Sequence, residues 1–118
     1  IVDRFHISTQ AYQSTRYGKD YDFHWMEERL AAIGFHLVFC TRTPESFAAA
    51  REKRLKVSGN PSQYDSLQPF IEEQERMRAL VARSLLPTLE LDVSDDDVNS
   101  AADRVVDWME TTGGLWSD

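Results

Sequence analysis

The chain has 118 residues and a formal net charge of −7, with 20 acidic against 13 basic side chains. This balance excludes a general nucleic-acid or membrane surface, because either surface needs a basic face. Cys40 is the single cysteine, which excludes a disulfide within the chain and favours a reducing compartment. The sequence has no run of about 18 apolar residues that could span a membrane, and its length fits one domain with its own core.

The first elements expected from the sequence are a strand end and a helix. Residues 1–4 have the apolar character of a strand that is ending. Residues 8–12 open a helix, for which Ser8 is a suitable cap. Residues 16–22 are polar and contain glycine, so we expect a loop there.

The next segment leads from a helix into a strand. Residues 23–33 carry apolar side chains at helical spacing, and Gly34 then supplies a left-handed stop. Residues 35–40 form a short, nearly continuous apolar run, which is typical of a strand covered on both faces. Strands of this kind belong to parallel sheets, so the sequence predicts a parallel sheet.

A third helix has a clear start in the sequence. Thr43 suits the cap position, and Pro44 suits the first helical position, where its missing N–H costs nothing. The helix then runs through three alanines and a basic cluster to Val57. We expect it to end near residues 59–61.

The rest of the chain contributes two helices and a strand. One side of a helix over residues 67–85 carries the apolar residues Leu67, Phe70, Ile71, Met77, Val81 and Leu85. Its other side carries the charged residues Glu72, Glu73, Glu75, Arg76 and Arg83. Residues 88–93 form a strand, and residues 97–109 form a last helix whose inward residues are Val98, Ala101, Val105 and Met109. This alternation predicts an α/β fold in which a parallel sheet of about three strands is flanked by about five helices.

Charged chemistry follows the first expected strand. Asp3 and Arg4 stand where that strand ends, and ligands of open α/β sheets bind outside the carboxyl ends of the strands. The triplet Asp3-Arg4-Phe5 is followed by Ser-Thr-Gln-Ala-Tyr-Gln at residues 8–13. In this order the residues resemble the thymidylate kinase family of nucleoside monophosphate kinases. The resemblance covers about residues 1–110.

The resemblance implies part of a P-loop kinase-like fold. The pattern G-x-x-x-x-G-K-[ST], which cradles phosphates, is absent: the one Gly-Lys pair precedes Asp20, and Gln13 stands where the first glycine should be. We therefore interpret residues 1–118 as a single domain that is the carboxyl-terminal part of a nucleotide kinase. Residues 1–65 would contain the acceptor site and the lid, and residues 66–118 the closing helices and the last strand.

The resemblance gives Asp3 and Arg4 catalytic roles. Asp3 would hold the water shell of Mg²⁺, a cation that needs only one or two carboxylates beside the phosphates. Arg4 would bind the acceptor phosphate with its planar, bidentate guanidinium. From the residues alone, Asp3 could instead cap a backbone group at the strand end, and Arg4 could pair with a structural carboxylate.

The substrate pocket implied by the resemblance begins at Arg4 and continues along the following segment. Its further residues are Phe5, Thr9, Gln10, Tyr12 and Gln13. An amide or a hydroxyl can bond a pyrimidine edge, and a tyrosine ring can lie against a base or a sugar. The alternative for Tyr12 is a structural role as the apolar anchor of the first helical turn.

A basic cluster in the third helix matches the mobile lid of the family. The cluster consists of Arg51, Lys53, Arg54 and Lys56. The resemblance gives Arg51 and Arg54 catalytic roles, because lid cations neutralise the phosphoryl group during transfer. The ATP-binding residues that it implies are Arg51, Lys53, Asp92 and Val93. Without the resemblance, the cluster could be a solvated helix face.

One position departs from the family pattern. Gln63 stands where an arginine is common just after the lid, which leaves the identity of the acceptor open. We expect a cytoplasmic homodimeric enzyme that uses Mg²⁺ and transfers a phosphoryl group from ATP to a deoxynucleoside monophosphate, with dTMP as the expected acceptor. The alternatives are a kinase for a deoxynucleoside or another deoxynucleoside monophosphate, and an inactive nucleotide-binding or interaction module. The 118-residue chain alone should be inactive, because nothing in it cradles a triphosphate.

Overall fold

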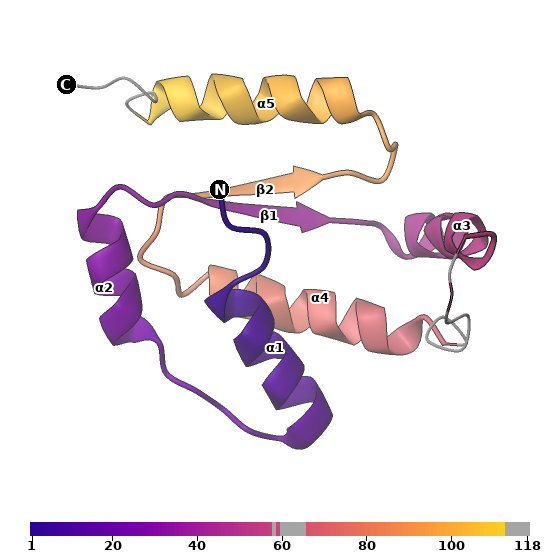
Figure 1. Cartoon of the computed structure of the whole chain (residues 1–118), viewed down its shortest axis with the longest axis horizontal. Coiled ribbons are helices and arrows are strands. Elements are labelled where there is room, and N and C mark those ends of the chain that lie inside the picture. The colour runs from indigo at the N-terminus through magenta and orange to yellow at the C-terminus, as the bar shows by residue number, and fades with distance from the viewer. Residues whose placement is uncertain (58, 60–65, 113–118) are drawn as a thin grey trace.

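Two parallel strands form the centre of the molecule (Figure 1). The structure is a computed structural model and describes residues 1–57, 59 and 66–112. Strand β1 (Leu37–Thr41) pairs in parallel with strand β2 (Thr88–Asp92). The fold of the described residues is therefore α/β.

Five helices surround this sheet in the described part of the chain. They are α1 (His6–Tyr17), α2 (His24–Ala32), α3 (Pro44–Leu55), α4 (Gln68–Val81) and α5 (Val98–Thr111). Figure 1 shows α1 and α4 on one side of the strands and α5 on the other, with α3 beyond the carboxyl end of β1. None of the helices over the described ranges is long and apolar enough to cross a lipid bilayer.

Local sequence sets where several helices begin and end. The Thr43 hydroxyl accepts a hydrogen bond from Ser46 N at 3.2 Å and caps α3 as expected. The Asp97 carboxylate does the same for α5, 3.0 Å from Ser100 N. Gly34 follows α2 with a φ of 83°, which confirms the expected left-handed stop.

The amino-terminal residues do not form the expected strand. Residues 1–5 lead into α1 without joining the sheet (Figure 1). Arg4 has a φ of 58°, a left-handed conformation that an extended strand excludes. Helix α1 begins at His6, so Ser8 lies in its first turn and does not cap it. Over the described residues, the prediction of three strands is therefore wrong, and the sheet has two.

Strand β1 is covered on one face, not on both as predicted. Phe39 and Thr41 are buried, whereas Val38 and Cys40, which alternate with them along the strand, are exposed. Helix α5 packs on β2. Val98 was expected to face inward but is 76% exposed, because α5 begins beyond the end of β2 (Figure 1).

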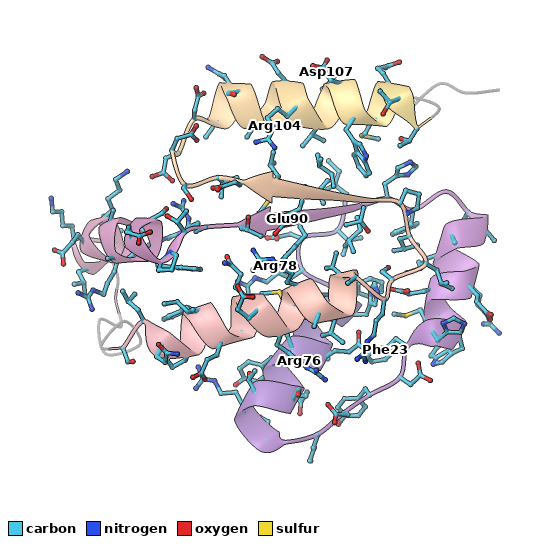
Figure 2. All side chains as sticks on the ribbon, turned by 180° about the vertical axis from the view of Figure 1, so that it is seen from behind. Phe23, Arg76, Arg78, Glu90, Arg104 and Asp107 are labelled. Atoms are coloured by element: carbon cyan, nitrogen blue, oxygen red, sulfur yellow. The ribbon has the colours of Figure 1, made fainter. Side chains whose placement is uncertain are left out.

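Two contacts fix α4 against the sheet. The Gln74 side chain is buried, and its amide accepts from Arg42 N and donates to Arg42 O, both at 2.8 Å. Arg78 and Glu90 point toward one another between α4 and β2 (Figure 2), and Arg78 Nε lies 3.0 Å from Glu90 Oε1. The core between these elements includes the buried apolar residues Ile7, Ala11, Phe39, Leu86 and Leu91.

A buried hydrogen bond between side chains fixes the start of α1. His6 Nε2 lies 2.6 Å from Glu27 Oε1 of α2, and both residues are buried. Glu27 also accepts hydrogen bonds from Ser84 Oγ at 2.8 Å and from Leu85 N at 2.9 Å. Burial raises the pKa of Glu27, but the hydrogen bonds outweigh this effect and hold the pKa below its ordinary value. The first turn of α1 is thereby tied to α2 and to the segment before β2.

Candidate functional site

The turn before α1 and the first turns of this helix form a cavity of about 290 Å³. Arg4, in the turn, has a left-handed backbone conformation with a φ of 58°. Non-glycine residues in this conformation are uncommon, and they cluster at functional sites. The residues that line the cavity are Arg4, Phe5, Ser8, Thr9, Tyr12, Gln13 and Glu73.

Helical spacing explains why these side chains meet. Positions three or four apart lie on one face of a helix, so Thr9 lies beside Gln13 on α1. Phe5, at the cap position before α1, lies beside Ser8 and Thr9 for the same reason. The Thr9 hydroxyl donates to Phe5 O at 3.2 Å, which leaves its oxygen lone pairs able to accept. The structure thus brings together the predicted substrate residues Arg4, Phe5, Thr9, Tyr12 and Gln13.

Tyr12 lines this cavity, and two neighbours on α1 contact its ring. Tyr12 is 41% exposed. The ring of Tyr17 meets the Tyr12 ring edge-on, with 6.0 Å between the two ring centroids. The Arg16 guanidinium lies 5.6 Å from the centre of the Tyr12 ring. A hydrogen bond with Tyr12 raises the pKa of Tyr17. Tyr12 is therefore a partly exposed residue of the cavity lining and is not a buried anchor.

Gln10 does not line this cavity with the other predicted substrate residues. It stands one position after Thr9 and is therefore rotated by about 100° around the helix. Its Nε2 donates to Tyr21 O at 2.7 Å. Its side chain lines a second cavity, of about 490 Å³, to which Phe23 and Arg76 also contribute (Figure 2).

Asp3 lies in the exposed turn before Arg4 and lines neither cavity. No group of three or more His, Cys, Asp or Glu side chains within the described ranges could hold a metal ion. A lone exposed carboxylate fits the water shell of a Mg²⁺ ion that is carried by phosphates. It does not fit a magnesium site made by protein ligands alone.

Lys53 of the basic cluster is held by an ion pair. Its Nζ lies 3.0 Å from Asp96 Oδ2, in the turn before α5. Arg42, at the end of β1, pairs with the same carboxylate. Hydrogen bonds from Arg42 and Lys53 hold the pKa of Asp96 below its usual range. The predicted ATP-binding residue Lys53 therefore has a structural partner.

The structure does not bring the two predicted lid arginines to the cavity beside α1. Arg51 NH2 lies 3.9 Å from Glu52 Oε1, and Arg54 is exposed. Neither arginine lines a cavity with Arg4, and Figure 1 shows α3 apart from α1. Gln63 lies outside the described residues. Helix α3 ends at Leu55, before Val57, so the predicted extent of the third helix to Val57 and residues 59–61 is wrong.

The turn after β2 forms hydrogen bonds with the end of β1 and with the cap of α3. Asp92 Oδ1 accepts from Ser94 N at 2.8 Å, and hydrogen bonds from the Ser94 side chain and backbone lower the pKa of Asp92. Val93 N donates to Thr41 O at 2.9 Å, and Ser94 Oγ accepts from Thr43 N at the same distance. The predicted residues Asp92 and Val93 thus lie at the carboxyl end of the sheet, beside the start of α3.

Glu73 is a cavity residue that sequence reasoning missed. The apolar pattern predicts that Glu73 lies on the charged side of its helix, but the residue is half-buried, whereas Glu72 and Glu75 are exposed. It follows Phe70 by three positions and precedes Met77 by four, so it interrupts the apolar stripe. A carboxylate at a stripe position was the signal that could have identified it.

The cavity beside α1 combines a guanidinium, two aromatic rings, hydroxyl and amide groups, and a carboxylate. Such a set can bind a small molecule that has an anionic end, a planar body and an edge that forms hydrogen bonds. No family model, curated protein or solved structure matches the chain.

Proposed function

We propose that this chain supplies the acceptor-nucleotide site of a phosphoryl-transfer enzyme of the thymidylate kinase type, with a P-loop kinase-like fold. The observation that carries the proposal is the cavity of about 290 Å³ that Arg4, Phe5, Thr9, Tyr12 and Gln13 share. Each of these side chains offers a group that a pyrimidine nucleoside monophosphate needs. The proposed acceptor is dTMP.

Arg4 would bind the acceptor phosphate. Its guanidinium can donate two parallel hydrogen bonds to phosphate oxygens, a geometry that lysine does not offer. The side chain is exposed and has no ion pair with another described residue, so its donors are free for a ligand. This absence of a partner supports a binding role over a structural one.

The nucleoside would lie along the face of α1 that lines the cavity. The rings of Phe5 and Tyr12 provide apolar surfaces for the base and the deoxyribose. The Thr9 hydroxyl and the Gln13 amide can each form hydrogen bonds with a pyrimidine edge. An amide can both donate and accept, as the alternating edge of thymine requires.

ATP and Mg²⁺ belong to the donor side of the proposed reaction. The 118 residues contain no P-loop, so the triphosphate cradle would come from outside them. Mg²⁺ would neutralise charge on the phosphates, and Asp3 would accept hydrogen bonds from its waters. Arg51 and Arg54 would act on the transferring phosphoryl group after movement of α3. A cytoplasmic homodimer remains part of this proposal.

A catalytically inactive nucleotide-binding module is the second candidate. It is favoured by the absence of a P-loop and by the ion pair that holds Lys53 on Asp96 at 3.0 Å. Both candidates bind a nucleotide through Arg4. They differ in turnover, which only the first would show once a phosphate cradle is supplied.

Isothermal titration of the 118-residue chain with dTMP and with thymidine tests the acceptor site. The wild type should bind dTMP more tightly than thymidine. Arg4→Ala should raise the Kd for dTMP by about tenfold or more, because a charge-assisted hydrogen-bonded contact is lost, and should leave the Kd for thymidine unchanged.

The matched control is Arg29→Ala, which removes an arginine that lies over Trp25 on α2. This variant should bind both ligands as the wild type does. Equal weakening of dTMP and thymidine by Arg4→Ala would show that Arg4 is structural. A wild type that binds neither ligand would overturn the proposed function.

A further inference from the structure

Glu73 is a carboxylate without a partner among the described residues. Glu72 accepts a hydrogen bond from Gln68 Nε2 at 3.1 Å, and Glu75 pairs with an arginine of the same helix. Glu73 is half-buried in the lining of the 290 Å³ cavity, and it has no hydrogen bond or ion pair with another described residue. A partly desolvated carboxylate without a donor costs free energy. A ligand that donates to Glu73 would offset that cost.

Arg4 and Glu73 give the cavity a positive and a negative group. They line the same cavity but do not pair with one another. A phosphate alone would meet Arg4 and be repelled by Glu73, and a neutral base alone would leave Arg4 without an anion. A ligand that carries an anion and, separate from it, a hydrogen-bond donor satisfies both groups. A nucleoside monophosphate has both features.

We propose that Glu73 determines specificity in this site by accepting a hydrogen bond from a neutral donor of the nucleotide, either the sugar 3′-hydroxyl or a base N–H. The inference rests on the proposed function and names what the acceptor site selects. Ionised carboxylate oxygens only accept hydrogen bonds. A nucleotide without the donor therefore leaves Glu73 unpaired on binding, and sites of this kind reject such analogues strongly.

Titration of the full 118-residue chain with three nucleotides tests this role. The probes are dTMP, its 3′-deoxy analogue and its N3-methyl analogue, which lack the hydroxyl donor and the base donor respectively. The variants are Glu73→Ala and Glu73→Gln, with Glu72→Ala as the control that removes a neighbouring exposed carboxylate. Circular dichroism melts establish that each variant is folded.

Glu73→Ala should raise the Kd for dTMP by about tenfold, and Glu73→Gln by less, because an amide oxygen still accepts a hydrogen bond. Glu72→Ala should leave the Kd unchanged. The analogue that lacks the contacted donor should bind the wild type about tenfold more weakly than dTMP does, and Glu73→Ala should remove this difference. The affected analogue identifies the donor as hydroxyl or N–H.

Two results overturn the inference. The first is dTMP affinity that is unchanged or improved in both Glu73 variants, which would make Glu73 only a source of negative charge. The second is a penalty for each analogue that is the same in the wild type and in Glu73→Ala. A wild type that binds dTMP through Arg4 but gives either result keeps the proposed function and loses this inference alone. A wild type that does not bind dTMP overturns both.

Discussion

At the scale of single residues, Glu27 fixes the position of a site that it does not touch. It receives hydrogen bonds from His6, Ser84 and Leu85, and so joins three segments of the chain. Glu27→Gln replaces a charged acceptor with a neutral one and adds a buried donor. We expect this variant to lose about 1–3 kcal/mol in the free energy of unfolding at neutral pH, measured by urea titration.

The loss caused by Glu27→Gln should depend on pH. Folding lowers the pKa of Glu27 from its ordinary value of 4.5. The stabilisation is therefore fully present above that value and is lost as the pH falls through the lowered pKa. Wild type and variant should converge in acid. Glu28→Gln, at an exposed neighbour, should have little effect, and a difference that stays constant into acid would contradict the prediction.

At the scale of elements, Gln74 joins α4 to the end of β1. Its amide satisfies both backbone groups of Arg42, and the side chain is buried. Gln74→Ala leaves an N–H and a C=O without protein partners, so we expect a loss of about 1–3 kcal/mol in the free energy of unfolding. Chemical denaturation measures this loss, and Gln68→Ala on the exposed side of α4 is the control. Equal effects of the two changes would show that the clamp contributes no stability.

The start of α3 could be predicted from the sequence because it depends on neighbours in the chain, whereas the start predicted for α1 at Ser8 was wrong. The Thr43 cap needs only Ser46 three residues later. The expected strand over residues 1–4 could not be judged in this way, because a strand requires hydrogen bonds from a partner strand whose position in the sequence local patterns do not indicate. The side of α4 on which Glu73 lies was also predicted wrongly. A charged residue is expected to face solvent, and its partial burial depends on neighbours in space that the sequence does not show.

At the scale of the whole molecule, only part of the candidate site could be predicted from the sequence. Arg4, Thr9 and Tyr12 meet in one cavity because they lie on one turn and one helical face, which sequence spacing can indicate. The relation of this cavity to the basic cluster of α3 could not be predicted, because it depends on how the helices pack. The ion pair between Lys53 and Asp96 spans 43 positions of the chain, and no local pattern indicates it.

The chain contains the proposed acceptor site but not a site for the donor phosphates, and this gives a prediction for the chain as a whole. Its 118 residues contain the cavity with Arg4 but no P-loop. Because phosphoryl transfer requires the donor phosphates to be held in line with the acceptor, the chain alone should bind dTMP and show no turnover with ATP and Mg²⁺. A coupled assay of ADP release measures this, with Arg4→Ala as the control for traces of a contaminating kinase. Turnover that exceeds background in the wild type and disappears in Arg4→Ala would show that the chain positions ATP by itself, against this prediction.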